Sequence, residues 1–385
     1  MFAKIAELNV KMFEKEIPLS SIERKQFIKK LNAWKNNIDN GELDVAAKFI
    51  PPPKKYVRNF AEIELHLLYY LFLARYYSAR EDKEEFDKTM EYLEARQPDF
   101  DNIHRYYYYR LIATRALKAR QYKDALDAFF MAEEVGQPEW ADVGYYYNFG
   151  YCLSDMNYTN KAIKYFLKAQ KLANLVRDHK YEVYIQTFLA NNYCKIGQGE
   201  EALKIIKKCC ILEDEKGSAS SNADFVCTTS GEIHYRLGKY DEAIALFKKS
   251  HGRLSSESVL YGRCVYYMAA ALIDSGRVNE GIACIEQGLE VLVEEIPREY
   301  VKIQIVLLEA LKHSTTLASQ ASVEYIETVA LPKLLETGQY SEAIHYCQLI
   351  RDFFENANDK DLALKYGHKI EEIYKIFINK RMEEL

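Results

Sequence analysis

The segment GEIHYRLGKYDEAIALFKKS, residues 231–250, decides the fold of this chain of 385 residues. A small residue, Gly231, stands in its first half, and a second one, Ala243, stands in the other half with Phe247 one helical turn later. Small side chains let two helices approach closely, and a large aromatic side chain fills the space beside them. The segment therefore predicts a hairpin of two packed α-helices.

The same pattern recurs along the chain at a nearly constant period. In steps of 37, 40, 41 and 38 residues, the small residue of the second helix is found at Ala125, Ala162, Ala202, Ala243 and Gly281. Such a period is typical of tetratricopeptide repeats, whose standard unit has about 34 residues, so we expect longer helices or loops here. Residues 300–335 keep helical periodicity without the small residues and predict one degenerate repeat. We expect about seven hairpins, stacked in a right-handed superhelix.

The N-terminal residues lack this pattern and predict a different helical module. Apolar residues recur with helical spacing from Ile22 to Ile38 after the capping sequence PLSS. The predicted fold class is therefore all-α. We expect an N-terminal helical bundle over residues 1–83, a helical linker over 84–102 and a repeat domain over 103–385.

Composition and charge exclude several classes of protein. The net charge of −5 is spread without a basic stripe, which argues against nucleic acid as a partner. No apolar run approaches the roughly 20 residues of a membrane helix, and the first residues do not read as a secretory signal, so we expect a cytoplasmic protein without membrane contact. The eight cysteines lack metal-ligand spacing and predict buried, reduced thiols. We expect neither a metal nor a cofactor, and a monomer or a weak homodimer.

A stacked array of hairpins lines a concave surface with the exposed face of each first helix. Amide, hydroxyl, aromatic and charged side chains on such a surface suit an extended peptide, whereas the alternative is an ordinary solvated helix face. The repeat pattern places on this face Arg110, Thr114, Tyr147, Tyr151, Asp155, Thr187, Asn191, Lys195, Thr228, Glu232, Tyr235, Arg236, Arg263, Tyr266 and Asp274.

Two N-terminal motifs resemble those of a known family. LNAWKNNI, residues 31–38, followed by LLYY, residues 67–70, resembles the asparagine–tryptophan helix and the paired-tyrosine helix of the Rap proteins of bacilli. The resemblance continues in YYYYRLIATRALKARQYKDALDAF, residues 106–129, and in ALKYGHKIEEIYK, residues 363–375. Rap proteins are tetratricopeptide proteins of quorum sensing, described as response regulator aspartate phosphatases and controlled by secreted and reimported Phr peptides.

The resemblance implies two binding surfaces. The N-terminal bundle would bind a response regulator, and the family motifs place this contact at Trp34, Glu64, Tyr69 and Tyr70. The repeats would bind a short signalling peptide, whose occupancy releases the regulator. The asparagine with which the family holds the peptide backbone corresponds to Asn192. An asparagine expected in the next repeat appears as Thr229, and an acidic position appears as Lys195, so we expect a ligand that differs from the usual family peptides.

Phosphatase activity depends on one position of the resemblance. The family's catalytic glutamine, whose amide positions water against the aspartyl phosphate, corresponds to Glu64. A carboxylate still accepts a hydrogen bond from water, but it repels an incoming phosphoryl group by roughly 1 to 4 kcal/mol at short range. We therefore expect sequestration of the regulator in preference to its dephosphorylation.

Two other classes of protein are compatible with a helical array. A constitutive tetratricopeptide scaffold would bind protein partners without catalysis and without a signalling peptide. A transcription factor of the related peptide-receptor families would need a helix-turn-helix at the N-terminus, and the first 50 residues contain no basic recognition helix with a tight turn.

Overall fold

The computed structural model describes residues 20–49, 63–176, 181–216, 222–256, 258–294, 299–315, 320–337 and 339–382. The regular structure of these residues is helical throughout, as the sequence predicts. The contacts divide the chain into two compact units, residues 1–145 and 146–385. This division does not test the predicted functional boundaries near residues 83 and 102, which stay predictions.

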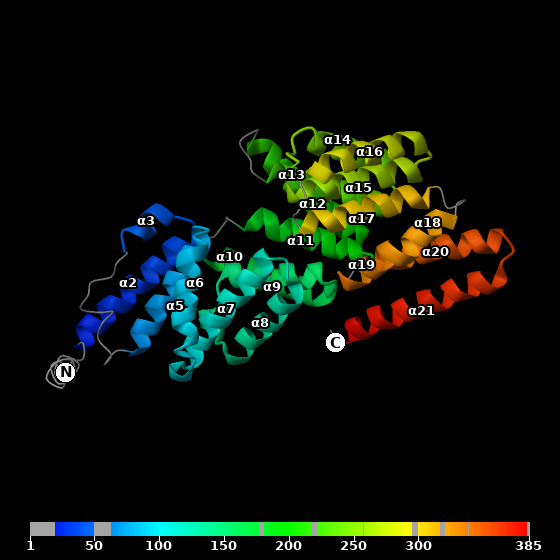
Figure 1. The fold of residues 1–385 in the computed structure, drawn as a ribbon. Helices are drawn as coiled ribbons and strands as arrows, with labels where there is room; N and C mark the ends of the chain where they lie inside the picture. Colours follow the sequence, from blue (N-terminus) through cyan, green and yellow to red (C-terminus); the bar gives the residue numbers. More distant parts are fainter. Residues whose placement is uncertain are drawn as a thin grey trace. The chain divides into compact units, whose positions relative to one another are not determined.

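The first unit is a set of short and medium helices that follow one another closely (Figure 1). They are α2 (Ser21–Asp39), α3 (Leu43–Ala47), α5 (Ile63–Ala79), α6 (Lys83–Glu94), the 3-10 helix η2 (Gln97–Asp99), α7 (Asn102–Lys118), α8 (Tyr122–Val135) and the 3-10 helix η3 (Pro138–Trp140). The Ser20 hydroxyl accepts a hydrogen bond from the Glu23 amide, while the Glu23 carboxylate accepts one from the Ser20 amide. This capping box begins α2 where the PLSS sequence predicts a helix start.

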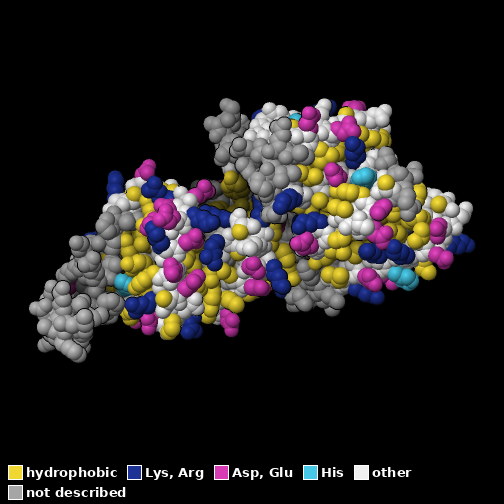
Figure 2. Space-filling model, in the orientation of Figure 1, with side chains coloured by type: hydrophobic (Ala, Val, Ile, Leu, Met, Phe, Trp, Pro, Cys, Tyr) yellow, Lys and Arg dark blue, Asp and Glu magenta, His cyan; other side chains and the backbone are white. Residues whose placement is uncertain are grey.

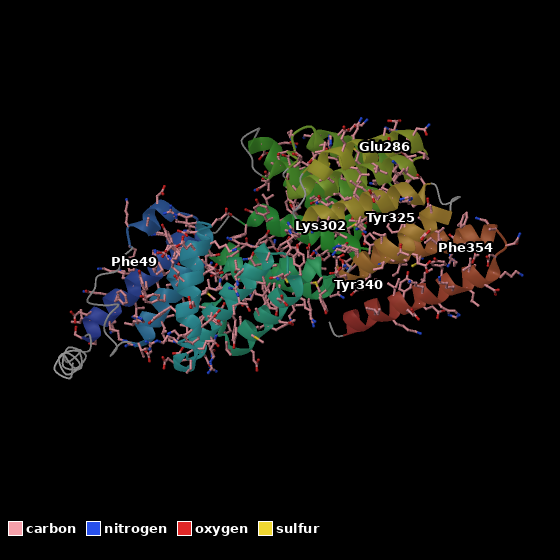
Figure 3. All side chains as sticks on the ribbon, viewed as in Figure 1. Phe49, Glu286, Lys302, Tyr325, Tyr340 and Phe354 are labelled. Atoms are coloured by element: carbon pink, nitrogen blue, oxygen red, sulfur yellow. The ribbon has the colours of Figure 1, made fainter. Side chains whose placement is uncertain are left out.

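Trp34 forms the centre of the bundle core. Its exposed fraction is 1%, and its ring stacks on Phe49 (ring centroids 4.9 Å apart) and on Tyr69 (5.2 Å). The indole Nε1 donates a hydrogen bond of 3.0 Å to the carbonyl of Ala46, so its one polar atom is satisfied. Phe49, which is labelled in Figure 3, lies shortly after the end of α3. One side chain thus joins α2, α3 and α5.

A buried network of charges also holds the first unit together. The Arg110 guanidinium of α7 donates to both carboxylate oxygens of Asp142, at 2.9 and 2.8 Å. Lys35 of α2 lies 3.2 Å from Asp142 and 2.8 Å from Asp39, which in turn pairs with Arg75 of α5 at 2.5 Å. Asp142 compensates the charge of the buried Arg110 guanidinium. Removing either partner of this pair would leave an uncompensated charge.

The second unit is built from helical hairpins. Its helices are the C-terminal part of α9 (Val143–Asp155), α10 (Thr159–Val176), α11 (Glu182–Lys195), α12 (Gly199–Lys216), α13 (Ala223–Arg236), α14 (Tyr240–His251), α15 (Val259–Asp274), α16 (Val278–Glu294), α17 (Glu299–Ser314), α18 (Gln320–Tyr325), the π-helical turn η5 (Ile326–Ala330), α19 (Leu331–Glu336), α20 (Tyr340–Asn356) and α21 (Lys360–Met382). Each first helix packs on the next helix in the chain, as α13, α14, α15 and α16 do in Figure 1.

Close helix contact in the hairpins rests on the small residues that the repeat pattern selects. In α9, the position of a Cβ added to Gly150 lies 3.0 Å from the Phe166 ring of α10. In α13, the same construction at Gly231 gives 2.7 Å to the Phe247 ring of α14. Gly238 makes the turn between these two helices with φ +71, a conformation that favours glycine. The hairpin predicted from residues 231–250 is confirmed.

The predicted degenerate repeat is a hairpin with an interrupted second helix. α17 packs against α18, η5 and α19 in turn. Pro332 lies at the start of α19 and lacks the amide that would continue the helical bonding, and the Leu331 amide bonds instead to the Ile326 carbonyl. His313 of α17 stacks on Tyr325, labelled in Figure 3 (ring centroids 4.5 Å apart). With this repeat, the described residues of both units contain seven hairpins from α7 to α21.

The last hairpin and the burial of most cysteines also agree with the predictions from the sequence. Phe354 of α20 points toward α21, where its ring stacks on Tyr366 (Figure 3). All eight cysteines are free thiols, and six of them are buried. They fill positions of small hydrophobic residues, as predicted.

The packing at Gly231 is testable by adding one methyl group. We expect Gly231→Ala to lower the free energy of unfolding by about 1–3 kcal/mol, because its Cβ would collide with the fully buried Phe247 ring. Gly367→Ala is the matched control, since nothing lies within 4 Å of that Cβ, and alanine should there stabilise α21 by about 0.5–1 kcal/mol. Urea unfolding of both variants checks the prediction, and equal effects would contradict it.

Candidate functional site

The candidate peptide site lies on the first helices of successive hairpins in the second unit. We call the surface carried by α9, α11, α13 and α15 the A-helix face and define it by Tyr151, Asn191, Lys195, Glu232, Arg236 and Arg263. α11 packs beside α13, and α13 beside α15, so these side chains belong to neighbouring helices. The predicted residues that are half-buried there are Tyr147, Tyr151, Asp155, Lys195, Tyr235, Arg263 and Tyr266. The predicted residues that are buried are Thr187, Asn191, Asn192, Thr228, Thr229 and Glu232.

Aromatic rings run across α9, α11 and α13. Phe188 is the hub, with ring centroids 5.4 Å from Tyr151, 6.0 Å from Tyr147 and 5.2 Å from Phe225. Burial raises the pKa of Tyr147 well above its ordinary value, so its hydroxyl stays protonated and can donate a hydrogen bond. The row offers an apolar strip with phenol groups, which suits the side chains of a peptide.

The two asparagines of α11 have different roles. The Asn192 amide donates to the Ser154 hydroxyl (2.9 Å) and to the Phe188 carbonyl (2.8 Å), and the residue has no exposed surface. Asn192 therefore joins α11 to α9 through these bonds, and its role in holding a peptide stays a prediction. Asn191 has an exposed fraction of 6%, and its side-chain oxygen has no hydrogen-bond partner in the described residues. A buried acceptor without a partner is costly unless a ligand supplies the donor.

The three threonines lie beneath this face. Thr187 donates to the carbonyl of Val183 at 2.7 Å, and Thr228 lies 2.7 Å from the Ser250 hydroxyl. Thr229 is also buried, and its hydroxyl has no partner in the described part of the chain. The bonds of Thr187 and Thr228 contribute to packing, and the predicted peptide contact of the three side chains stays a prediction.

A cluster of charged groups lies where α11, α13 and α15 meet. The Glu232 carboxylate has an exposed side-chain fraction of 3% and pairs with Arg236 (3.3 Å) and with Arg263, whose Nε lies 3.0 Å away. Burial opposes ionisation of Glu232, but Arg263 and Arg236 outweigh it and lower its pKa to about 2. Arg236 also donates to the Tyr267 hydroxyl at 3.0 Å. Lys195 lies near this cluster, without a carboxylate within ion-pair distance in the described residues.

Tyrosines extend the site toward the last repeats. The Tyr235 hydroxyl donates to Asp274 at 2.9 Å, which links α13 to α15. The Tyr266 hydroxyl lies 3.4 Å from that of Tyr346 in α20. These contacts occupy the hydroxyl groups, so Tyr235 and Tyr266 present mainly their rings.

Two predicted residues of this face belong to the first unit. Arg110 is buried in the ion pair with Asp142, so its predicted place on a peptide-binding face is wrong. Thr114, one turn later, donates to the Arg110 carbonyl at 2.9 Å. The buried charge, which the repeat pattern could not reveal, decides the position of this arginine.

The predicted regulator-binding residues divide between core and surface. Trp34 and Tyr69 are core residues with exposed fractions of 1% and 2%, so a direct contact of either with a partner is contradicted by their burial. Tyr70 is half-buried and packs against Tyr92 (ring centroids 4.4 Å apart). Glu64 is exposed, with 58% of its side-chain surface accessible. The regulator-binding role stays a prediction for Tyr70 and Glu64.

Glu64 lies in the first turn of α5 and has two partners. Its carboxylate pairs with Arg24 of α2 at 2.5 Å, and its carbonyl lies 2.9 Å from Nε2 of the buried His104 of α7. The carbonyl accepts, so Nε2 carries the proton in this contact. Arg24 thus places a positive charge beside the Glu64 carboxylate.

The sequence did not select several residues of these sites. Ser154, Phe188, Phe225, Tyr267 and Arg24 are each defined by partners far away in the chain. Phe188 could have been found, since it lies one turn before the predicted Asn192. The others depend on contacts between hairpins, which no local pattern records.

The described residues contain no group of histidine, cysteine and acidic side chains that could hold a metal ion. Among the described helices, none combines the length and the apolar character that a membrane crossing requires. Figure 2 shows basic and acidic side chains interspersed on the drawn face of each unit, without a basic stripe.

The Glu232 ion pairs predict a pH-dependent stability. The folded pKa of about 2 is below the ordinary 4.5, so this group stabilises the fold above pH 4.5 and loses that contribution as the pH falls toward 2. We expect Glu232→Gln to lower the free energy of unfolding by about 3 kcal/mol at neutral pH. The difference from the native chain should shrink between pH 4.5 and 2. Chemical unfolding at several pH values measures it, with Glu280→Gln on the surface as a control expected to change little.

Two family models match parts of the chain. A family model described as tetratricopeptide repeat matches residues 143–174, and one described as anaphase-promoting complex, cyclosome, subunit 3 matches residues 215–288. No curated protein sequence matches the chain.

Solved structures match over nearly the whole chain. The apo form of the quorum sensor NprR from B. thuringiensis has a TM-score of 0.71 at 18% identity, covering 91% of this chain and 99% of that one. A Rap protein complexed with competence and sporulation factor has a TM-score of 0.73 at 16% identity, covering 93% and 100%. Aspartyl phosphate phosphatase F from Bacillus subtilis has 0.57 at 16%, covering 93% and 95%. This chain therefore has the fold of the Rap and NprR proteins, a helical bundle followed by a tetratricopeptide superhelix, as its sequence motifs predict.

Proposed function

We propose that this chain is a cytoplasmic, peptide-regulated signalling protein. Its N-terminal bundle binds a response regulator and inhibits it by sequestration, and a short signalling peptide on the A-helix face triggers release. In this proposal, residues 1–83 are the effector, residues 84–102 the linker and residues 103–385 the sensor. The likeness to a Rap protein complexed with competence and sporulation factor, and to NprR in complex with its cognate peptide NprX, supports a peptide as the ligand.

The observation that carries the proposal is the buried, unpartnered amide oxygen of Asn191 in the described residues. Its amide oxygen is buried, without a partner in the described residues, and lies on a helix face beside an aromatic row and a charge cluster. A peptide backbone offers an N–H at every residue and would satisfy this oxygen. An adaptor that binds folded domains has no need of a buried acceptor, so Asn191 favours the peptide-controlled protein over the constitutive scaffold.

Asn191 and Asn192 make a matched pair for testing this proposal. We expect Asn191→Leu to weaken binding of active peptides about tenfold, because one buried hydrogen bond is lost, and to leave the fold as stable as before. Asn192→Leu should destabilise the fold, because its bonds to Ser154 and Phe188 disappear. Calorimetry with short synthetic peptides and unfolding curves measure the two effects.

Binding of a response regulator by the N-terminal bundle is tested separately. Purified response regulators are titrated with the full chain, and active peptide is then added while solution scattering records the dimensions of the chain. We expect binding of a regulator, its release by peptide and compaction of the chain on peptide binding. A chain that binds partners but neither releases them nor changes dimensions would be the constitutive scaffold, and a chain that binds no regulator would refute the effector role.

Glu64 separates sequestration from dephosphorylation. We expect the native chain to bind a phosphorylated regulator without speeding the loss of phosphate, because the carboxylate repels the phosphoryl group and engages Arg24. Glu64→Gln should accelerate phosphate loss, since the amide positions water without that repulsion. Phosphate release from the labelled regulator is the measurement. Equal rapid release by the native chain would show that Glu64 supports catalysis.

A further inference from the structure

Lys195 is the one charged side chain of the A-helix face whose protein partners do not balance its charge. It is half-buried on α11, one helical turn after Asn191. Its amine donates to the Ser154 carbonyl at 3.4 Å, a long hydrogen bond to a neutral group. No carboxylate of the described residues lies within 4 Å of it.

The neighbouring charges leave an excess of positive charge at this point. Glu232 is engaged by both Arg236 and Arg263. Asp155 of α9 acts on Lys195 from beyond ion-pair distance, so the five groups carry three positive and two negative charges. Glu342 of α20 acts on Arg236, whereas the largest charge effects on Lys195 come from Arg236, Glu232, Asp155 and Arg263.

The protonation of Lys195 shows the same imbalance. Burial, followed by the positive charge of Arg236, lowers the pKa of its amine, and Glu232 and Asp155 do not offset the two effects. The ammonium form is therefore destabilised in the free protein. An added anion would remove this penalty, and a cation would increase it.

We propose that Lys195 anchors a carboxylate of the signalling peptide, so that the ligand of this chain is an acidic peptide or one held by its free C-terminus. This inference rests on the proposed peptide function and adds the ligand's chemistry to it. The Asn191 oxygen lies on the same helix face one turn away, where side chains are about 5–6 Å apart at Cβ. It accepts a backbone N–H while Lys195 binds the carboxylate, and the aromatic row takes the neighbouring side chains.

Pools of short random-sequence peptides, each with one fixed residue, test the proposal on the full chain. One pool fixes glutamate, a second lysine and a third glutamine, and each is made with a free and with an amidated C-terminus. We expect the native chain to bind the best acidic or free-acid pool about tenfold or more tightly than the amidated lysine pool. Binding of the amidated glutamate pool would identify a side-chain carboxylate, whereas capture of all free-acid pools would identify the C-terminus.

Three variants separate recognition from structure. Lys195→Met should lose the preference for carboxylate, and Lys195→Glu should favour the lysine pool. Lys239→Met removes the same charge from an exposed turn and should keep the native preference. Without peptide, Lys195→Met should unfold at the same or a higher denaturant concentration than the native chain, because a poorly solvated charge is gone.

The outcomes distinguish this inference from the function on which it rests. Binding of acidic and basic pools with equal affinity, or an unchanged preference in Lys195→Met, would overturn the role of Lys195 and leave the peptide sensor standing. Failure of every pool to bind would overturn the peptide sensor itself. A lowered unfolding midpoint of Lys195→Met with an unchanged preference would assign the lysine to stability alone.

Discussion

The close approach of two helices at a small residue is the constraint on which this structure depends. The small residues of the second helices that have no exposed surface are Ala125, Ala162, Ala202 and Ala243. A larger side chain would separate the helices and remove the contacts of the aromatic ring beside them. Because the hairpins with these small residues keep this contact, equivalent positions of their first helices point the same way, which is how residues some 40 positions apart share one face.

The A-helix face combines demands of packing and of chemistry. The residues that join neighbouring hairpins, such as Asn192 and Thr228, have satisfied side chains and no exposed surface. Asn191, whose amide oxygen has no partner among the described residues, and Lys195, whose amine bonds only a neutral carbonyl there, lie one turn apart on α11. A stable fold tolerates few such groups, and their coincidence on one helix face is the basis of the proposed ligand site.

The first unit is also held together by a buried aromatic side chain and by buried ion pairs. Its helices converge on Trp34 and on the buried charges around Arg110 and Asp142, which hold α2, α5 and α7 in a defined arrangement. Glu64 remains on the surface, tied to α2 by Arg24 and to α7 by His104. Glu64 is therefore held by the same helices that form the core.

The sequence by itself determined the helical hairpins, their number, the degenerate repeat and the cap of α2, because these depend on local periodicity and on small residues at fixed spacing. It also predicted a peptide site on the first helices of the hairpins, which stays a prediction. Only the tertiary structure decided that Asn192 is bonded to α9 while the Asn191 oxygen has no partner in the described residues, that Trp34 and Tyr69 are core residues, and that Arg110 is paired with Asp142. Burial and pairing arise from helices that meet across many residues, and no local pattern contains them.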